Sequence, residues 1–411
     1  MPLPPWPPRR VVAVSLAVAA TLPGDALLYA VLPVLWQQLG LELWMVGVLL
    51  SANRVVRLAT NPFAGWLAGR VGIHRPFVAA VFATTAVTVA YTLAPGFAAW
   101  VALRAVWGGL WSFLRLGGFL AALAAGHLGR GYALGFYNGV ANLGTLLAMA
   151  AGGVLTDTIG LNATLWLFAA LALPAGLAML REGRGEDDRP AVPEPGAPPV
   201  VHAPALERWG AYAAAVVTGT AGSPLVLSSL GLLIVQRHGE SISLGGLVLG
   251  AATLNGALLA VRFAIQPVWG PLAGHLSDRL GRLGFAGVAG LLEIAGMLAL
   301  SFAGPLAWTV AMSVVVFVAG LALRVSADAL AGDTAPPGAR AQFMGWYSNA
   351  ADFGSALGPL LAFPLASALG LETVYRLGAA FLLLAGGAVL LVLRQGRRRA
   401  GGASLHAPQE P

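Results

Sequence analysis

Long apolar runs separated by short polar turns occupy most of this 411-residue chain. Each run is about 20 residues or more, the length that an α-helix needs to cross the hydrocarbon core of a bilayer. The runs lack the alternation of apolar and polar residues that is typical of a membrane β-barrel. The pattern therefore predicts twelve transmembrane helices, near residues 11–36, 43–68, 76–95, 98–124, 131–156, 162–181, 210–235, 243–272, 283–302, 305–331, 341–368 and 372–394.

The turns and spans of the first half return in the second half. Residues 65–75 read GWLAGRVGIHR and residues 274–282 read GHLSDRLGR, a shift of 209 positions between the leading glycines. Arg115 falls on Arg324 at the same shift, and GFY at 135–137 returns as GWY at 345–347. A duplication of this length predicts a protein built from two six-helix repeats.

Polar segments divide the chain into five parts. We expect an N-terminal tail, a first six-helix bundle, a linker, a second six-helix bundle and a C-terminal tail, at residues 1–10, 11–181, 182–208, 209–394 and 395–411. The linker and the last tail are polar and rich in Pro and Gly, which favours disorder. The basic first ten residues have no small-residue cleavage site after them and are interpreted as a tail rather than a cleaved signal.

Composition supports an integral membrane protein. The chain is 58% hydrophobic and 10% charged, whereas soluble domains carry roughly 25% charged residues. The absence of Cys excludes disulfides and thiolate metal sites. The net charge of +7 comes from arginines in membrane-flanking turns, so no nucleic-acid partner, metal or cofactor is expected.

Arginine counts predict the orientation. With both termini placed inside, sixteen of the 24 arginines fall in inner segments, two in outer segments and six within spans. Because cytoplasmic loops carry the excess of positive charge, we expect a multi-pass protein of the cytoplasmic (inner) membrane with both termini in the cytoplasm.

Several motifs carry a family resemblance. Gly274 through Arg282 matches the form GxLxDRxGR, and the first copy departs from it at Gly69. Span four has Arg104 followed by Gly108, and span five keeps three glycines of the antiporter motif GxxxGPxxGG but lacks its central Gly-Pro. With these motifs the chain resembles the major facilitator superfamily over essentially its whole length. The resemblance implies an all-α fold of twelve membrane helices, in which spans one, four, seven and ten line a central cavity.

The turn after the second span of each repeat is a candidate gate. Glycines such as Gly65 permit a tight turn at the membrane surface, and Asp278 is expected at a helix N-terminus, where negative charge is favoured. Packing of these turns against the opposite half would use Arg70, Asp278 and Arg279. The alternative is that these arginines only set the topology.

Ionisable residues inside the predicted spans are candidates for function, because each costs about 2.5–3.5 kcal/mol at the centre of the bilayer. On span four, Arg104, Trp111 and Arg115 share one helical face, as a cavity wall would. The resemblance places Arg115 and its repeat partner Arg324 near the central cavity. The expected substrate-binding set is Arg115, Arg324, Trp111, Arg104 and Tyr29. Alternatively, Arg324 pairs with Asp328 four residues later, and Arg115 pairs with another buried acid.

Asp25 is the candidate proton-coupling residue. It follows Pro23-Gly24, which is expected to loosen the helix, and Tyr29 lies one turn away on the same face. A carboxylate that alternates between an apolar environment and contact with Arg can load and release a proton. The alternative is a fixed ion pair with Arg54, Arg104 or Arg115. The resemblance further predicts polar contacts between the two halves, Arg57 with Asp352 and Asn142 with Arg262. Glu293 has no predicted role.

These features favour a secondary active transporter that moves a small organic solute by alternating access, with proton coupling and efflux as the leading expectation. The positively charged cavity favours an anionic solute. Alternatives are proton-coupled uptake or facilitated diffusion of an organic anion or a sugar-like solute, and a non-transporting sensor of the same fold. An enzyme is disfavoured, because all six His lie in loops, tails or span ends and no phosphate-binding loop is present. The expected partners are the solute, protons and membrane lipid, and the expected state is a monomer.

Overall fold

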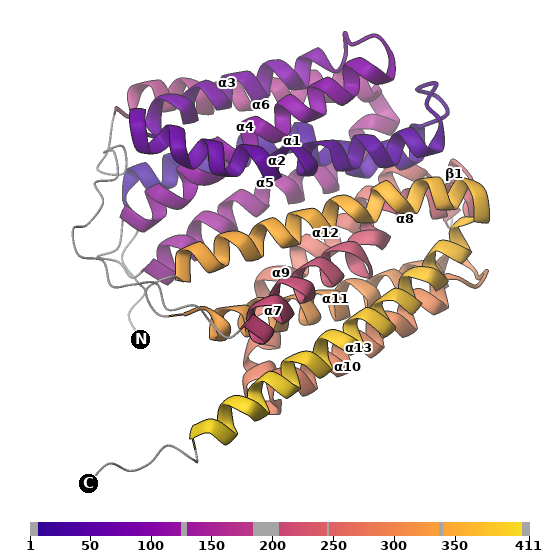
Figure 1. Cartoon of the computed structure of the whole chain (residues 1–411). Coiled ribbons are helices and arrows are strands. Elements are labelled where there is room, and N and C mark those ends of the chain that lie inside the picture. Colours follow the sequence, from indigo (N-terminus) through magenta and orange to yellow (C-terminus); the bar gives the residue numbers. More distant parts are fainter. Residues whose placement is uncertain (1–6, 125–129, 184–204, 245, 337–339, 405–411) are drawn as a thin grey trace. The chain divides into compact units, whose positions relative to one another are not determined.

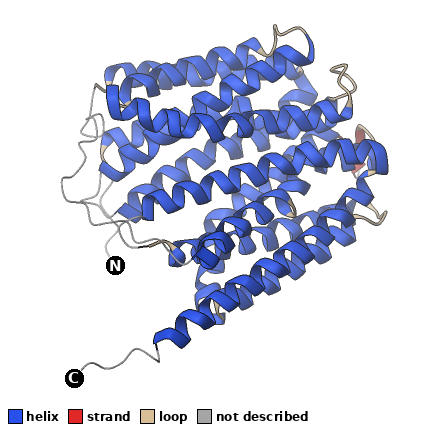
Figure 2. Ribbon diagram, in the orientation of Figure 1, coloured by secondary structure: helices blue, strands red, loops and turns tan. Residues whose placement is uncertain are grey.

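The computed structural model describes residues 7–124, 130–183, 205–244, 246–336 and 340–404. Nearly all of these residues are helical, and the described part of the chain holds one short pair of strands (Figure 2). The elements, labelled in Figure 1, are α1 (Arg9–Leu35), α2 (Leu43–Val71), α3 (His74–Ala90), α4 (Gly96–Ala124), α5 (Arg130–Ile159), α6 (Leu161–Arg181), α7 (Ala205–Thr220), α8 (Ser223–His238), β1 (Ser241–Leu244), β2 (Leu247–Gly250), α9 (Ala251–Leu280), α10 (Arg282–Leu300), α11 (Leu306–Thr334), α12 (Arg340–Leu369) and α13 (Leu371–Ser404).

The helices have the dimensions of membrane spans. Within the described ranges, eleven helical segments are long and apolar enough to cross a bilayer, and α7 and α8 together form one of them. The remaining predicted span corresponds to α3, which has 17 residues. Large apolar side chains such as Trp166 and Leu177 of α6 are more than half exposed, as expected where lipid rather than water covers the surface. The predicted all-α membrane fold is confirmed.

Glycines in the left-handed region mark equivalent turns of the two repeats. Gly72 (φ 79°) joins α2 to α3, and Gly281 (φ 85°) joins α9 to α10. Gly160 (φ 83°) joins α5 to α6, and Gly370 (φ 80°) joins α12 to α13. Because residues with a Cβ rarely adopt this conformation, glycine allows the chain to reverse within one or two residues. The duplication in the sequence is therefore present in the backbone.

The chain forms two compact units, which we call unit 1 (residues 1–193 and 228–264) and unit 2 (residues 194–227 and 265–411). In unit 1, α1 packs on α4, α5 and α6, and α3 packs on α4 and α6. In unit 2, α7 packs on α11, α12 and α13, and α10 packs on α11 and α13. These pairings correspond one by one, so the two repeats share them, and unit 1 adds the packing of α2 on α4.

The expected boundary between the two bundles follows the sequence repeats, whereas the two compact units divide the chain at other positions. Residues 228–264 belong to the second repeat by sequence, yet they pack within unit 1. The linker expected at 182–208 lies, for residues 184–204, outside the described residues, as do the tails at 1–6 and 405–411.

Three predicted boundaries differ from the structure. The eighth span was expected to begin near 243, but residues 241–244 and 247–250 pair as antiparallel strands and α9 begins at Ala251. The first strand alternates polar and apolar residues as Ser-Ile-Ser-Leu, and the β-branched Ile and Val of the two strands favour this conformation. The seventh span is interrupted between Thr220 and Ser223. Helix α13 continues to Ser404, ten residues beyond the predicted end at 394.

Candidate functional site

A buried cluster of charged and amide side chains lies where α1, α2 and α4 meet in unit 1. Nη1 of Arg104 donates a hydrogen bond to Oδ1 of Asp25 within an ion pair, and Nδ2 of Asn53 donates to the same oxygen at 3.1 Å. The Asp25 side chain is 10% exposed and the Arg104 side chain 0%. Arg104 is one of the three partners of Asp25 that the sequence raised, and the two residues are paired in this structure.

Tyr29 and two backbone carbonyls of α2 complete this cluster. The Tyr29 hydroxyl donates to the carbonyl of Leu50 at 3.1 Å, and Nε of Arg104 donates to the carbonyl of Leu49 at 2.7 Å. The Tyr29 ring lies 5.4 Å from the guanidinium carbon of Arg104 and 5.2 Å from that of Arg54. Asp25 and Tyr29 therefore share one polar environment, as predicted from their spacing on α1.

The residues before Asp25 also serve helix packing. Helix α1 runs from Arg9 to Leu35 with Pro23 inside it, and the local loosening expected at Pro23-Gly24 stays a prediction. A Cβ on Gly24 would collide with Thr88 of α3, so the glycine allows α1 and α3 to approach closely. Pro23 has no N–H to donate to the carbonyl of Ala19, and Gly144 of α5 packs directly on that carbonyl.

The predicted cavity wall on span four divides into two parts. Arg104 is fully buried, and Gly108 lies so close to the backbone of Asn53 that a Cβ would collide with it. This part is packed inside unit 1, and Arg104 offers no surface to a solute in this structure. Trp111 stacks on the buried Trp107, with ring centroids 5.6 Å apart, and Arg115 lies 5.6 Å from the ring of Phe119. Trp111 and Arg115 are only partly buried.

A second charged cluster joins α11 and α12 in unit 2. Nε of Arg324 donates to Oδ1 of Asp328 at 3.0 Å, which confirms the alternative of a pair four residues apart. The hydroxyl of Tyr347, a fully buried residue, donates to the same oxygen at 2.7 Å. The side chains of Arg324 and Asp328 are 39% and 47% exposed. Unlike Asp25 and Arg104, both partners have surface available to a ligand.

Arg70, Asp278 and Arg279 lie in the last turns of α2 and α9. The turn expected at Gly65 is wrong, because Gly65 lies inside α2 and the turn follows at Gly72. Gly65 has open space around it, and Arg70 stacks over Trp66 at 4.2 Å from the ring centroid. Asp278 was expected at a helix N-terminus, but this expectation is wrong. The residue lies in the last turn of α9, where the helix dipole disfavours a negative charge.

Arg282 supplies the compensating charge for Asp278. Its Nη2 lies 3.2 Å from Asp278 Oδ1, and its Nε lies 3.1 Å from Asp333 Oδ2 at the end of α11. The arginine thereby connects the ends of three helices, while Arg279 is exposed. This network explains why the motif places an acid and its last arginine on either side of a tight glycine turn.

The predicted polar contacts between the halves stay predictions. Arg57 lies on α2, Asp352 on α12, Asn142 on α5 and Arg262 on α9, and all four are partly buried. Arg262 also lies 5.1 Å from the ring of Phe263.

Two residues that sequence analysis missed attach α9 to the first repeat within unit 1. Nδ2 of Asn255, which is 0% exposed, donates to the carbonyl of Ala30 in α1 at 2.7 Å. Oδ2 of Asp157, near the end of α5, accepts from the N–H of Thr253 at 2.8 Å and from its hydroxyl at 2.6 Å. Asn255 carries no charge and is therefore not among the ionisable residues that the sequence singles out. Asp157 lies one position beyond the span predicted at 131–156.

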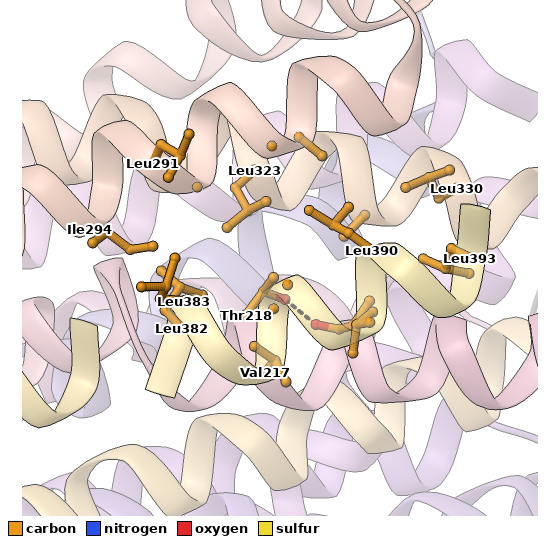
Figure 3. A pocket seen from close by; sticks show the side chains of 18 residues that line it. Val217, Thr218, Leu291, Ile294, Leu323, Leu330, Leu382, Leu383, Leu390 and Leu393 are labelled. Atoms are coloured by element: carbon orange, nitrogen blue, oxygen red, sulfur yellow. Dashed lines mark hydrogen bonds between the residues drawn. The ribbon is translucent and has the colours of Figure 1, made fainter. Parts of the chain in front are cut away.

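Two cavities lie within single units. A cavity of about 710 Å³ in unit 1 is lined by the ends of α1 and α5 and by the hairpin, and it includes Gln38, Asp157 and Glu240. A cavity of about 240 Å³ in unit 2 is lined by apolar residues of α7, α10, α11 and α13 (Figure 3). Leu291, Leu323 and Leu390 converge on it, so it suits an apolar group. None of the predicted substrate-binding residues lines either cavity.

No group of three His, Cys, Asp or Glu that could hold a metal ion occurs in the described ranges. A protein with two helical repeats and ion pairs within its membrane spans has the architecture of a solute transporter. Residues 14–270 and 252–409 match the Major Facilitator Superfamily, and the chain belongs to this family. It is a multi-pass membrane protein of a family of transporters.

Relatives and solved structures agree with this assignment. The chromaffin granule amine transporter of Homo sapiens is 31% identical over 141 residues, which cover 34% of this chain and 27% of the relative. The synaptic vesicular amine transporter of Mus musculus is 31% identical over 137 residues, which cover 33% of this chain and 26% of the relative. The match thus spans about a quarter of the length of these curated relatives.

The fold is similar to that of solved transporters. A bacterial homolog of the human lysosomal transporter Spinster, in an inward-facing and unoccupied conformation, aligns with a TM-score of 0.78 at 16% identity, over 95% of this chain and 97% of that one. A POT family transporter in complex with 5-aminolevulinic acid aligns with a TM-score of 0.75 at 12% identity, over 95% and 97%. At these identities the likeness shows the fold alone.

Proposed function

We propose that this chain is a proton-coupled secondary transporter that exports a small organic solute across the cytoplasmic membrane by alternating access. The observation that carries the proposal is the buried pair of Asp25 and Arg104. Removing two charges from water costs several kcal/mol per ion even when they pair, so such a pair is poor evidence of a role in stability alone. Protonation of Asp25 would release Arg104 from its partner and change the preferred packing of α1 against α4.

Flux measurements in proteoliposomes test the coupling. The wild type should move solute faster with an imposed pH gradient than without one, and Asp25→Asn should abolish the dependence on the gradient while binding persists. Glu372→Gln, in the first turn of α13, is the matched control and should transport as the wild type does. Gradient-driven flux that survives in Asp25→Asn would remove Asp25 from the coupling mechanism.

The substrate proposal rests on the exposed charges. Arg324 and Arg115 keep accessible surface, and Trp111 beside Arg115 offers an aromatic face, so an organic anion is the leading solute class. The negative charge of Asp328, 3.0 Å from Arg324, offsets part of this field. The amine transporters among the relatives favour an organic cation as the second candidate.

A thermal-shift screen separates the two solute classes, because a ligand that binds only the folded state raises the melting temperature. We expect carboxylates to stabilise the wild type and to lose this effect in Arg115→Ala or Arg324→Ala. Stabilisation by monoamines that is lost in Asp328→Asn would favour the cation instead. Binding without flux would indicate the sensor alternative.

We also propose that the turns around Gly65, Arg70, Asp278 and Arg279 close the cytoplasmic side, with Arg57–Asp352 and Asn142–Arg262 as polar contacts between the two repeats that act as hinges of the rocking motion. Support comes from the exposure of Arg70 and Arg279 and from the Arg282 network that joins three helix ends. Asp352→Asn should slow transport without loss of expression.

A further inference from the structure

The break in the seventh span leaves the start of a helix inside the membrane. Helix α7 ends at Thr220, α8 begins at Ser223, and Gly222 between them has φ 72°. The first N–H groups of a helix have no partner within it. In hydrocarbon, where water does not supply one, each unsatisfied group costs several kcal/mol. Something in the protein must therefore receive the N–H groups of α8.

Glu293 of α10 provides an acceptor. Its side chain is buried, with a residue exposure of 2%, and its Oε1 accepts a hydrogen bond from the N–H of Ser223. A negative charge at the start of a helix is further favoured by the helix dipole. Glu293, for which the sequence predicts no role, thus lies at the start of α8, where a carboxylate is favoured.

Two glycines make room for this carboxylate. A Cβ on Gly222, at the break, or on Gly320, in α11, would collide with the Glu293 carboxylate. Three segments of unit 2 therefore form a slot shaped for this one side chain. Gly290 lies on α10, the helix that carries Glu293. A Cβ on Gly290 would lie 3.9 Å from its neighbour Leu323, so a methyl group fits there but not at Gly320.

The chain passes from unit 2 to unit 1 five residues after Ser223, between Leu227 and Ser228. It returns between Ala264 and Ile265, next to Pro267 within α9. Breaks and prolines are where helices bend. The first crossing therefore lies beside the break in span seven, and the second lies beside a proline within the continuous helix α9.

We propose that Glu293 is a positioning residue that anchors the break of span seven at residues 221–224 and makes this break the hinge at which the span bends during transport. The carboxylate holds the first turn of α8 to unit 2, so the bend of the chain is confined to the break. This inference rests on the proposed alternating access, and it assigns a role in transport to an acid outside the substrate and proton-coupling residues.

Hydrogen exchange of the full-length protein in nanodiscs tests the anchor without any ligand. In Glu293→Leu and Gly320→Ala the amides of Gly222, Ser223, Leu225 and Val226 should exchange about ten-fold faster or more, as expected for the loss of a hydrogen bond to a charged group. Glu293→Gln, which keeps an acceptor oxygen, should restore part of the protection. Gly290→Ala is the matched control and should exchange as the wild type does.

Distance measurements test the hinge. Because the chain has no Cys, spin labels attach only at Gln236→Cys on α8 and Ala303→Cys in the turn after α10, both exposed. Glu293→Leu and Gly320→Ala should broaden or shift the distance distribution, and Gly290→Ala should not. Unchanged exchange or unchanged distances in both variants would overturn the proposal. If these distances respond but the wild type moves no solute, the hinge stands and only the transport proposal fails.

Discussion

The two repeats place their charged clusters in opposite environments. In unit 1 the pair of Asp25 and Arg104 is 10% and 0% exposed and is surrounded by Asn53, Tyr29 and α2 carbonyls. In unit 2 the pair of Arg324 and Asp328 is 39% and 47% exposed, with one further contact to Tyr347. Duplication preserved the helix pairings described above and the glycine turns, but not the charged side chains. The two repeats therefore share a backbone arrangement and differ in their polar groups.

This difference sets how strongly each pair should affect stability. In a low-dielectric site the loss of one partner leaves an uncompensated charge, whereas solvent screens an exposed pair. The Asp25–Arg104 cluster of unit 1 therefore fits a switch whose two states are both costly in free energy. The Arg324–Asp328 cluster of unit 2 fits a surface on which a ligand takes the place of one partner of the ion pair.

The largest effect is expected from Asp25→Ala, which leaves Arg104 charged and buried. Breaking a buried pair costs about 3–5 kcal/mol, so the variant should unfold at a much lower temperature than the wild type in thermal denaturation. The double variant Asp25→Leu with Arg104→Met should recover most of this loss, because an apolar pair of similar size is often neutral. A double variant as unstable as Asp25→Ala would show that hydrogen bonds to α2, rather than charge, dominate the cluster.

A smaller effect is expected from Gly108→Ala, because a Cβ there collides with the backbone of Asn53 and disturbs the same cluster. Overpacking of this kind costs about 1–3 kcal/mol. Gly109→Ala is the adjacent control, since its Cβ would meet only the methyl group of Thr60 at 3.6 Å. Equal melting temperatures for the two variants would contradict a tight α2–α4 contact at Gly108.

The smallest effect on stability is expected from Arg324→Ala. A half-exposed pair contributes about 0–1 kcal/mol, so thermal denaturation should change little while the stabilisation by a bound solute is lost. Asp328→Ala is the paired control, since it removes the same ion pair but keeps the cation. A melting temperature that falls as far as in Asp25→Ala would erase the contrast between the two clusters.

Periodicity and repetition were sufficient to predict most of the fold. Apolar runs located the helices, and the shift of 209 positions anticipated equivalent turns at Gly72 and Gly281. Spacing of four residues was enough to raise the Arg324–Asp328 pair. These features depend on neighbours along one helix, which a sequence displays directly.

Features that depend on contacts between distant helices were not predictable in the same way. Glu293 accepts a hydrogen bond from the N–H of Ser223, at the break in span seven, and nothing near residue 293 signals that break. The hairpin at 241–250 was absorbed into an apolar run, since average hydropathy does not register alternation over four residues. The misplacement of Asp278 arose from assigning the motif to the start of one helix rather than the end of another.

The packing of residues 228–264 within unit 1 has a consequence for protein engineering. A gene divided between the two repeats would encode a second polypeptide whose buried Asn255 has its acceptor, the carbonyl of Ala30, in the first polypeptide. Gly256, which contacts the backbone of Met149, would be separated from its counterpart in the same way. Co-expressed fragments should therefore reassociate through this segment, and either fragment alone should be prone to degradation.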